Sequence, residues 1–145
     1  MALNPPVPEV EANLLKFDQR GFIQGTKTSL ANEGFIYVPM AYQQAGTKCH
    51  LHIALHGCLM TMDTIGDQFP KHAGYNTWAE ANNIIVLYPF TKMSQYYPMN
   101  PNGCWDWWGY TDRHYAVKKG VQIQFILSLI QAITGRTDLL TEEQQ

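Results

Sequence analysis

The sequence predicts an α/β fold, and three observations support this class. Two apolar stretches, CHLHIALHGC and IIVLYP, have the composition of buried strands. The segment between them reads as helical and is long enough for the crossover that two parallel strands require. A longer helix follows near the end, where apolar residues recur every four positions.

The bulk composition bounds the size and the partners of the protein. A chain of 145 residues fits one ordinary domain, and 46% hydrophobic with 15% charged residues suits a packed core. The net charge is −2 with scattered Lys and Arg, which gives no support to nucleic acid or an anionic membrane as partners. The longest apolar run, Val121–Ile133, is interrupted by glutamines and is too short to span a bilayer.

Residues 1–12 are rich in Pro and Glu and are predicted to be a loose lead-in, residues 13–135 to be the domain, and residues 136–145 to be a polar tail. The first residues lack the basic and apolar regions of a signal peptide, so the sequence by itself predicts a cytosolic chain. Cys49, Cys58 and Cys104 allow one disulfide and one free thiol, and their spacing leaves the pairing open.

The elements are predicted in this order. NLLKFDQRGFIQGT and EGFIYVPMAY each contain a short strand, and together they favour an antiparallel pair. Residues Leu51–Leu55 form a strand that we expect to be covered on both faces. The following segment, DTIGDQFPKHAGYNTWAEANN, is expected to be two short helices divided at Pro70 and Gly74. The apolar face of the second helix is expected to hold Tyr75, Trp78, Ala79 and Ala81.

IIVLYP is then a buried strand that stops at Pro89, which completes a parallel βαβ unit. Residues 90–115 form a long aromatic loop, and a loop of this length in a small domain is typical of a functional one. The final helix is predicted over Ala116–Thr134, with Gly135 as its stop. Its buried face should hold Val117, Val121, Phe125, Leu129 and Ile133.

Three histidines close together in the sequence raise the question of a metal site, but the sequence does not support one. His50, His52 and His56 lie along one strand and its end, but no further residue is fixed within reach to complete a tetrahedral zinc site. Strand histidines bonded to neighbouring backbone are the simpler interpretation. We expect neither a metal nor a cofactor.

A nucleophile is also hard to find. The corner ALHGC follows a strand as the oxyanion corner of many hydrolases does, where backbone N–H groups hold the developing charge. Ser29, Ser94 and Ser128 are the serines of the chain, and none stands in a G-x-S-x-G elbow. Cys49 or Cys58 could attack in principle, but no helix N-terminus or cationic partner is evident that would lower a thiol pKa.

The aromatic loop contains the segment NPNGCWDWWGY, with Trp105, Trp107 and Trp108 close together. These rings either fill the core beneath the loop or form an exposed wall. Aromatic walls with a few amides are how proteins hold carbonyl-rich apolar chains.

Several of these motifs, in matching order, resemble one enzyme family. CHLHIALHGC, HAGYNTWAEANNIIVLYP, NPNGCWDWWGY and the closing helix are together similar to the C-terminal part of polyhydroxybutyrate (PHB) depolymerases of the circularly permuted α/β-hydrolase type, from about Leu14 to Gly135. The resemblance implies an incomplete α/β-hydrolase fold: a parallel βαβ core, a short N-terminal strand pair and a C-terminal helix. In that family the Ser, Asp and His of the triad lie in the N-terminal part, which has no counterpart in this sequence.

The resemblance also assigns residues. The backbone N–H of Cys58 would be a catalytic oxyanion donor, Asn102 and Trp107 would line the substrate crevice, and Cys58 and Cys104 would form a disulfide. Tyr42 stands where the family commonly has a cysteine that pairs with the one matching Cys49, so Cys49 loses its usual partner.

The expected function is therefore that of a partial PHB depolymerase-like ester hydrolase, inactive alone. Its expected partners are a polyhydroxyalkanoate polyester or its oligomers and a complementary N-terminal half that carries the triad. An esterase of ordinary order should continue beyond the last helix into a strand and an elbow, and RTDLLTEEQQ does not. A non-catalytic protein that binds polyester or another apolar chain, and a gene product without function, remain as alternatives. Members of the family are usually secreted, in contrast to the leader-less start of this chain.

Overall fold

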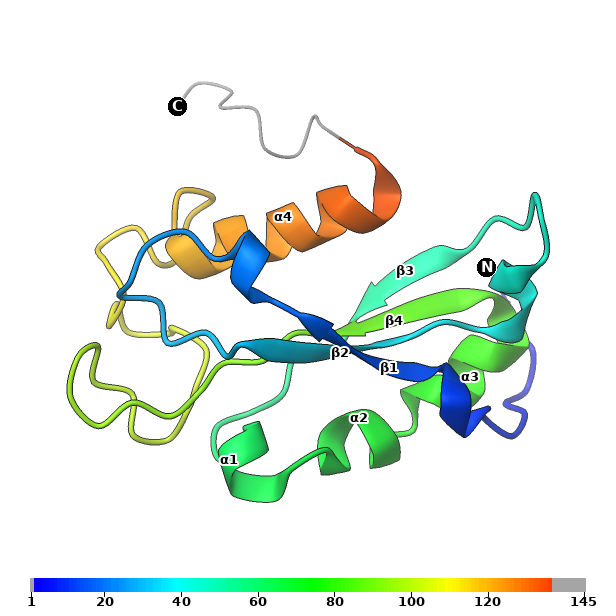
Figure 1. The fold of residues 1–145 in the computed structure, drawn as a ribbon, viewed down its shortest axis with the longest axis horizontal. Coiled ribbons are helices and arrows are strands. Elements are labelled where there is room, and N and C mark those ends of the chain that lie inside the picture. The colour runs from blue at the N-terminus through cyan, green and yellow to red at the C-terminus, as the bar shows by residue number, and fades with distance from the viewer. Residues whose placement is uncertain (1, 137–145) are drawn as a thin grey trace.

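A computed structural model describes residues 2–136, which form a mixed four-stranded sheet between two helical layers (Figure 1). The strand order is β1-β2-β4-β3. The strands are β1 (Leu14–Asp18), β2 (Glu33–Tyr37), β3 (His50–Ile53) and β4 (Ile84–Tyr88). The helices are α1 (Met62–Ile65), α2 (Gln68–His72), α3 (Tyr75–Asn82) and α4 (Val121–Thr134), with three short 3-10 turns at Glu11–Asn13, Arg20–Phe22 and Met40–Gln43.

The strand pairing confirms the predicted α/β class. β1 and β2 are antiparallel, and β2 pairs antiparallel with β4. β3 and β4 run parallel, with α1, α2 and α3 in the connection between them. The predicted N-terminal strand pair and the predicted βαβ unit are both present.

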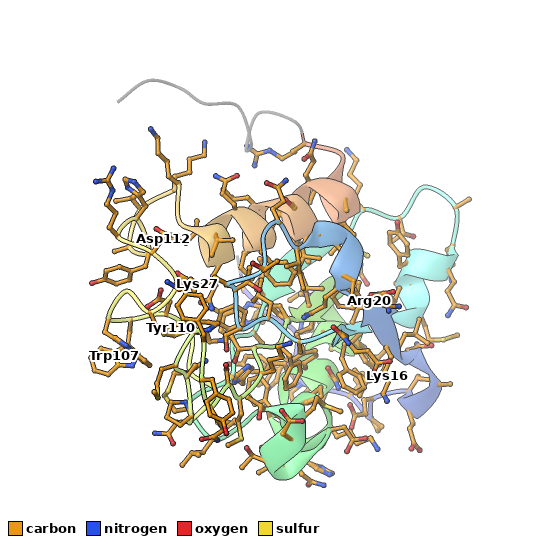
Figure 2. All side chains as sticks on the ribbon, turned by 60° about the vertical axis from the view of Figure 1, so that its left-hand side comes forward. Lys16, Arg20, Lys27, Trp107, Tyr110 and Asp112 are labelled. Carbon is orange, nitrogen blue, oxygen red and sulfur yellow. A yellow bond between two sulfur atoms is a disulfide. The ribbon has the colours of Figure 1, made fainter. Side chains whose placement is uncertain are left out.

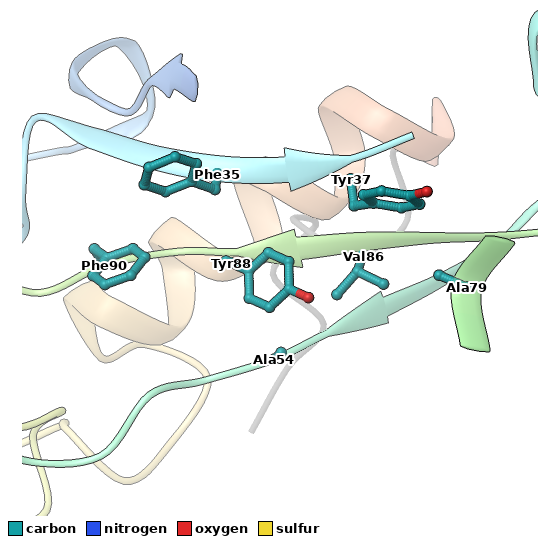
Figure 3. Packing of buried hydrophobic residues seen from close by; sticks show 7 residues of the cluster. All are labelled: Phe35, Tyr37, Ala54, Ala79, Val86, Tyr88 and Phe90. Carbon is teal, nitrogen blue, oxygen red and sulfur yellow. The ribbon is translucent and has the colours of Figure 1, made fainter. Parts of the chain in front are cut away.

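Strand β4 lies in the interior of the sheet, and its side chains reach both layers. Val86 and Tyr88 belong to a cluster on the α3 side, whereas Leu87 belongs to a cluster under α4. Alternate residues of a strand face opposite sides, so burial on both sides explains the uninterrupted apolar run IIVLYP. Figure 3 shows the first cluster, which comprises Phe35, Tyr37, Ala54, Ala79, Val86, Tyr88 and Phe90.

Strand β3 differs from its prediction because it lies at the edge of the sheet. Leu51 and Ile53 pack against the cluster under α4, but His50 and His52 on the other face are exposed. Leu55 is 51% exposed. The expectation of a strand covered on both faces is therefore wrong. Among the described residues β3 has a neighbouring strand on one side only, and the face that carries His50 and His52 is exposed to solvent.

The crossover contains three helices where two were predicted. The predicted break at Pro70 is wrong because Pro70 lies inside α2; the breaks fall at Gly66 and, as predicted, at Gly74, both of which have positive φ. The predicted apolar face of α3 is also only partly right. Ala79 is buried, but Tyr75 and Trp78 are exposed.

Two asparagines occupy the buried face of α3 instead. The side chain of Asn76 donates to Pro70 O and accepts from the Tyr88 hydroxyl, and Asn82 donates to Trp78 O and to Asn4 O. Hydrogen bonds thus replace apolar contacts at this interface, because a buried amide with partners is not penalised.

Helix α4 begins at Val121, five residues later than predicted, and residues 113–120 form turns and bends. A side chain at Gly120 would place its Cβ 2.7 Å from His114 O, so the chain packs tightly just before the helix. Val117 is consequently 53% exposed, while Phe125 and Leu129 form the buried face as predicted.

Over its described part, residues 2–12, the predicted loose lead-in contains no β-strand or α-helix. It lies against α3, where Asn4 N–H donates to Asn82 Oδ1 and Val7 N–H donates to Thr77 O. Most of the predicted polar tail, residues 137–145, lies outside the described residues. Within residues 2–136, no helix combines the length and the apolar character needed to cross a bilayer.

Candidate functional site

A cavity of about 350 Å³ opens between the end of β3 and the aromatic loop. Its lining includes Cys58, Asn102 and Trp107, which the family resemblance assigned to one site, together with Pro101, Cys104 and Trp108. The structure therefore brings all three assigned residues to one crevice. They arrive from two segments of the chain, the corner at residues 56–59 and the loop at residues 100–111.

Two links hold these segments together. A disulfide joins Cys58 to Cys104 with their Cα atoms 4.3 Å apart, as predicted. One residue further on, Leu59 adopts a positive φ of 60° and its N–H donates to Asn102 O at 2.7 Å. Because the Cys58 sulfur is bonded to Cys104, the chemistry available to Cys58 is that of its backbone.

The backbone N–H of Cys58 lies between two N–H groups that are already used. Gly57 N–H points to the sulfur of Met60 at 3.3 Å, and Leu59 N–H is bonded to Asn102. Within residues 2–136 no acceptor takes the Cys58 N–H. A donor without a partner, on a residue that lines a crevice, has the chemistry of an oxyanion donor.

Beneath the crevice lies a buried asparagine that sequence reasoning did not single out. The side chain of Asn100 is fully buried and accepts from Cys104 N–H at 3.0 Å. Its amide N–H groups face Cys104 O at 2.9 Å, Ser29 Oγ at 3.0 Å and the Tyr110 hydroxyl at 3.1 Å. Burial raises the pKa of Tyr110 to about 12, so this hydroxyl stays protonated at neutral pH.

The Asp106 carboxylate holds the turn that contains Trp107 and Trp108. The Asp106 carboxylate accepts from the backbone N–H groups of Gly109 at 2.6 Å, Tyr110 at 3.0 Å and Thr111 at 2.9 Å. Asp106 therefore shapes the turn that carries Trp107 and Trp108. Trp107 is 69% exposed, and Figure 2 shows its ring at the outer limit of the molecule. The ring centres of Trp107 and Trp108 lie 5.1 Å apart in an edge-to-face arrangement. Because both rings are exposed, they form the exposed wall and not part of the core.

His56 is the buried member of the three strand histidines. Its Nδ1 lies 2.8 Å from Gly57 O, and its Nε2 lies 3.2 Å from Thr91 N–H. His52 instead packs its ring against Tyr75 at 4.9 Å. Within the described part of the chain, no three His, Cys, Asp or Glu side chains are grouped to hold a metal ion.

None of the serines lines the crevice. Ser29 is buried and donates to Lys92 O at 2.8 Å, and Ser128 donates to Gln124 O within α4. Cys49 is a free thiol whose pKa is raised by burial, which disfavours the reactive thiolate. Residues 2–136 thus place an unpartnered backbone N–H beside an exposed aromatic wall, and no serine or free thiol lines the crevice between them.

A second groove of about 490 Å³ adjoins the first, because Trp107 lines both. Its lining is mostly apolar and comes from the end of β3, the aromatic loop and α4, including Leu55, Ile123, Ile126 and Leu127. Trp105 also lines it, and the buried indole N–H of Trp105 has no acceptor among the described residues.

No protein-family model matches the chain. Two curated relatives do. The poly(3-hydroxybutyrate) depolymerase of Delftia acidovorans is 39% identical over 126 residues, which covers 86% of this chain and 24% of the relative. The polyhydroxybutyrate depolymerase of Talaromyces funiculosus is 36% identical over 134 residues, which covers 87% of this chain and 39% of the relative.

Solved structures agree with these sequences. The crystal structure of PHB depolymerase from Penicillium funiculosum matches with a TM-score of 0.79 and 33% identity, covering 90% of this chain and 43% of that one. A PHB depolymerase variant complexed with an R3HB trimer matches with the same values. The chain spans less than half the length of each of these relatives.

Proposed function

We propose that this chain, which is homologous over most of its length to a part of PHB depolymerases, forms the oxyanion corner and the substrate wall of a polyester hydrolase. The observation that carries the proposal is the convergence of Cys58, Asn102 and Trp107 on one crevice, with the Cys58 N–H unclaimed. The corresponding fold is an incomplete α/β-hydrolase fold of the circularly permuted type.

Each residue has a role that its chemistry suits. In ester hydrolysis a serine attacks the carbonyl carbon with a histidine as general base, and the acyl-enzyme is then released by water. The Cys58 N–H would donate to the carbonyl oxygen as it becomes an oxyanion. The Asn102 side chain is exposed and can donate to a neighbouring ester carbonyl, while the Trp107 ring covers the aliphatic part of the chain. The proposed ligand is a 3-hydroxyalkanoate polyester or its oligomers.

The nucleophile would come from a complementary half, which is the second proposed partner. Within residues 2–136, three observations support such a partner: the open outer edge of β3, the apolar groove beside it, and the unpaired indole N–H of Trp105. Loss of one oxyanion donor costs about 3 kcal/mol of transition-state stabilisation. Loss of the whole nucleophile costs far more, so the chain alone should not hydrolyse short p-nitrophenyl esters above a heat-denatured control.

Binding tests the proposal directly, since it does not need the triad. We expect an R3HB trimer to bind the purified chain, as measured by calorimetry, and we expect Trp107→Ala to abolish the binding. Trp78→Ala is the matched control, because Trp78 is 43% exposed on α3 and lines neither cavity. An absence of trimer binding, or equal loss with both variants, would overturn the proposal.

A non-catalytic binding protein is the second candidate, and it is favoured by a crevice that no serine or free thiol among residues 2–136 lines. This candidate requires a self-sufficient fold. A compact monomer with a cooperative melt, no binding of a hydrophobic dye, and Trp107-dependent retention on PHB granules would support it. Self-association or dye binding that is suppressed by a complementary half would support the hydrolase instead.

A further inference from the structure

We infer that His56 is a positioning residue, which holds the Gly57–Cys58 peptide so that the Cys58 N–H faces the crevice. The inference rests on the proposed function, because the direction of that N–H matters to chemistry only if it meets an oxyanion. It concerns a side chain that lines neither cavity.

The hydrogen bonds around the ring define where its proton lies. Thr91 N–H can only donate, and it points at Nε2 of His56 at 3.2 Å, so Nε2 is the acceptor nitrogen. The Thr91 hydroxyl does not compete, because it donates to Gly103 O at the shorter distance of 2.7 Å. The proton is therefore on Nδ1, and Nδ1–H donates to Gly57 O at 2.8 Å.

The ring has little freedom to leave this arrangement. It is 3% exposed and stacks on Phe90 with ring centres 4.9 Å apart, while Phe69 and Trp105 pack at 6.5 Å and 5.7 Å. These neighbours are apolar, and burial lowers the pKa of His56, which keeps the ring in the neutral form that the hydrogen bonds require.

The planarity of the peptide carries the effect to Cys58. In a trans peptide the C=O and the N–H point in opposite directions. With Gly57 O directed at the buried ring, the N–H of Cys58 must point away from the interior. Cys58 is exposed and lines the crevice, and its N–H has no acceptor among residues 2–136. His56 thus sets the direction of the Cys58 N–H without itself contacting the ligand.

The same network reaches the opposite side of the crevice. Thr91 bonds both to His56 and to the carbonyl of Gly103, which lies between Asn102 and Cys104. Buried Thr91 therefore connects the corner and the loop by hydrogen bonds, in addition to the disulfide that joins them. A shift of the ring would move the oxyanion donor relative to the wall.

Nuclear magnetic resonance on the ¹⁵N-labelled chain tests the inference in two steps. The ring nitrogen shifts of His56 in the unsubstituted protein should report the neutral Nδ1–H form at pH 7. An R3HB trimer should then shift both the Cys58 amide and the Trp107 indole. In His56→Leu, which removes the donor, the Cys58 amide should lose this response, and the trimer should bind about fivefold more weakly.

His56→Asn is the rescue variant, because its amide N–H can replace Nδ1–H, and it should restore most of the response. His52→Leu, on the exposed face of β3, is the control and should change nothing.

The outcomes separate this inference from the proposed function. If the trimer moves the Trp107 indole but the Cys58 response survives His56→Leu, the inference fails and the proposed function stands. If the trimer moves neither signal, the proposed function fails.

In that case the ligand-free spectra decide: the Cys58 amide should shift in His56→Leu and return in His56→Asn. A His56 ring that is protonated on Nε2 at pH 7 overturns the inference whether or not the variants fold.

Discussion

The crevice is made of two sets of residues that differ in almost every physical respect. One set, which we call the frame, comprises His56, Thr91, Asn100 and Cys104, and every member is buried and hydrogen-bonded. The other set, the wall, comprises Asn102, Trp107 and Trp108, and every member is exposed. The difference teaches that the residues that fix the geometry are not those that would contact a ligand. Substitutions should therefore separate stability from binding.

Removal of the disulfide should have the largest effect on the frame. In a chain-entropy model, a bridge between residues 46 apart contributes about 4 kcal/mol to the free energy of unfolding. We expect the double variant Cys58→Ser with Cys104→Ser to lose an amount of this order in urea unfolding. Cys49→Ser removes the free thiol and is the control. A comparable loss of unfolding free energy in the control would show that the disulfide does not stabilise the fold more than the free Cys49 does.

Asn100→Ala should follow, with a loss of about 2–3 kcal/mol, because it leaves the buried Cys104 N–H without its acceptor and removes one of the donors to Cys104 O. Asn102→Ala is the matched control. Its side chain is exposed, so we expect a change within about 0.5 kcal/mol. Equal losses in the two variants, measured by the same urea titration, would remove the distinction between frame and wall.

A smaller effect is expected from pH. The folded-state pKa of His56 lies below its unfolded value of 6.5, so the unfolded chain binds the extra proton more readily. The contribution of His56 is fully present above pH 6.5 and is lost as pH falls through the folded pKa. Melting temperatures measured from pH 8 to pH 5 should therefore decline less steeply in His56→Asn than in the unsubstituted chain. Parallel curves would contradict the buried neutral ring.

The smallest effect on stability is expected in the wall. Trp107 is 69% exposed, so Trp107→Ala should change the free energy of unfolding by less than about 0.5 kcal/mol. The same variant should lose binding of the R3HB trimer. If Trp107→Ala instead destabilised the fold as much as Asn100→Ala, the ring would belong to the core and the comparison would fail.

Sequence patterns predicted the elements whose environment is local. The uninterrupted run of β4 and the strand pair at the start were correct, because alternation and apolar runs are properties of the strands themselves. The exposure of β3 was not predictable, since its edge position depends on which strands pair. The burial of Gln122 in the first turn of α4 was not predictable either, because its amide donates to Thr28 O and to the Tyr110 hydroxyl, which belong to other segments.

The site divides in the same way. Cys58, Asn102 and Trp107 were assigned to one crevice because short motifs around them resemble those of a known family, and the structure does bring them to one cavity. Asn100 was not singled out, and His56 was interpreted only as a histidine bonded to neighbouring backbone, since their other partners come from distant segments, such as Ser29 at 71 residues and Thr91 at 35 residues. A glutamine, an asparagine or a histidine gives no sign in the sequence of the backbone groups that it will satisfy. The residues of the wall could be predicted from sequence motifs, whereas the hydrogen bonds of the frame could be identified only from the three-dimensional structure.

The disulfide also changes what a protease could do to this chain. Between its two cysteines lies the loop tip with Tyr96 and Tyr97, which are 87% and 74% exposed, and the pairing of Ser94 with Asn100 closes that tip. Exposed tips of this kind are the preferred sites of proteolytic nicking. A cut there would leave the corner with Cys58 on one fragment and the tryptophan wall on the other. Because Cys58 and Cys104 remain bonded, the two fragments would migrate as one species until a reductant is added.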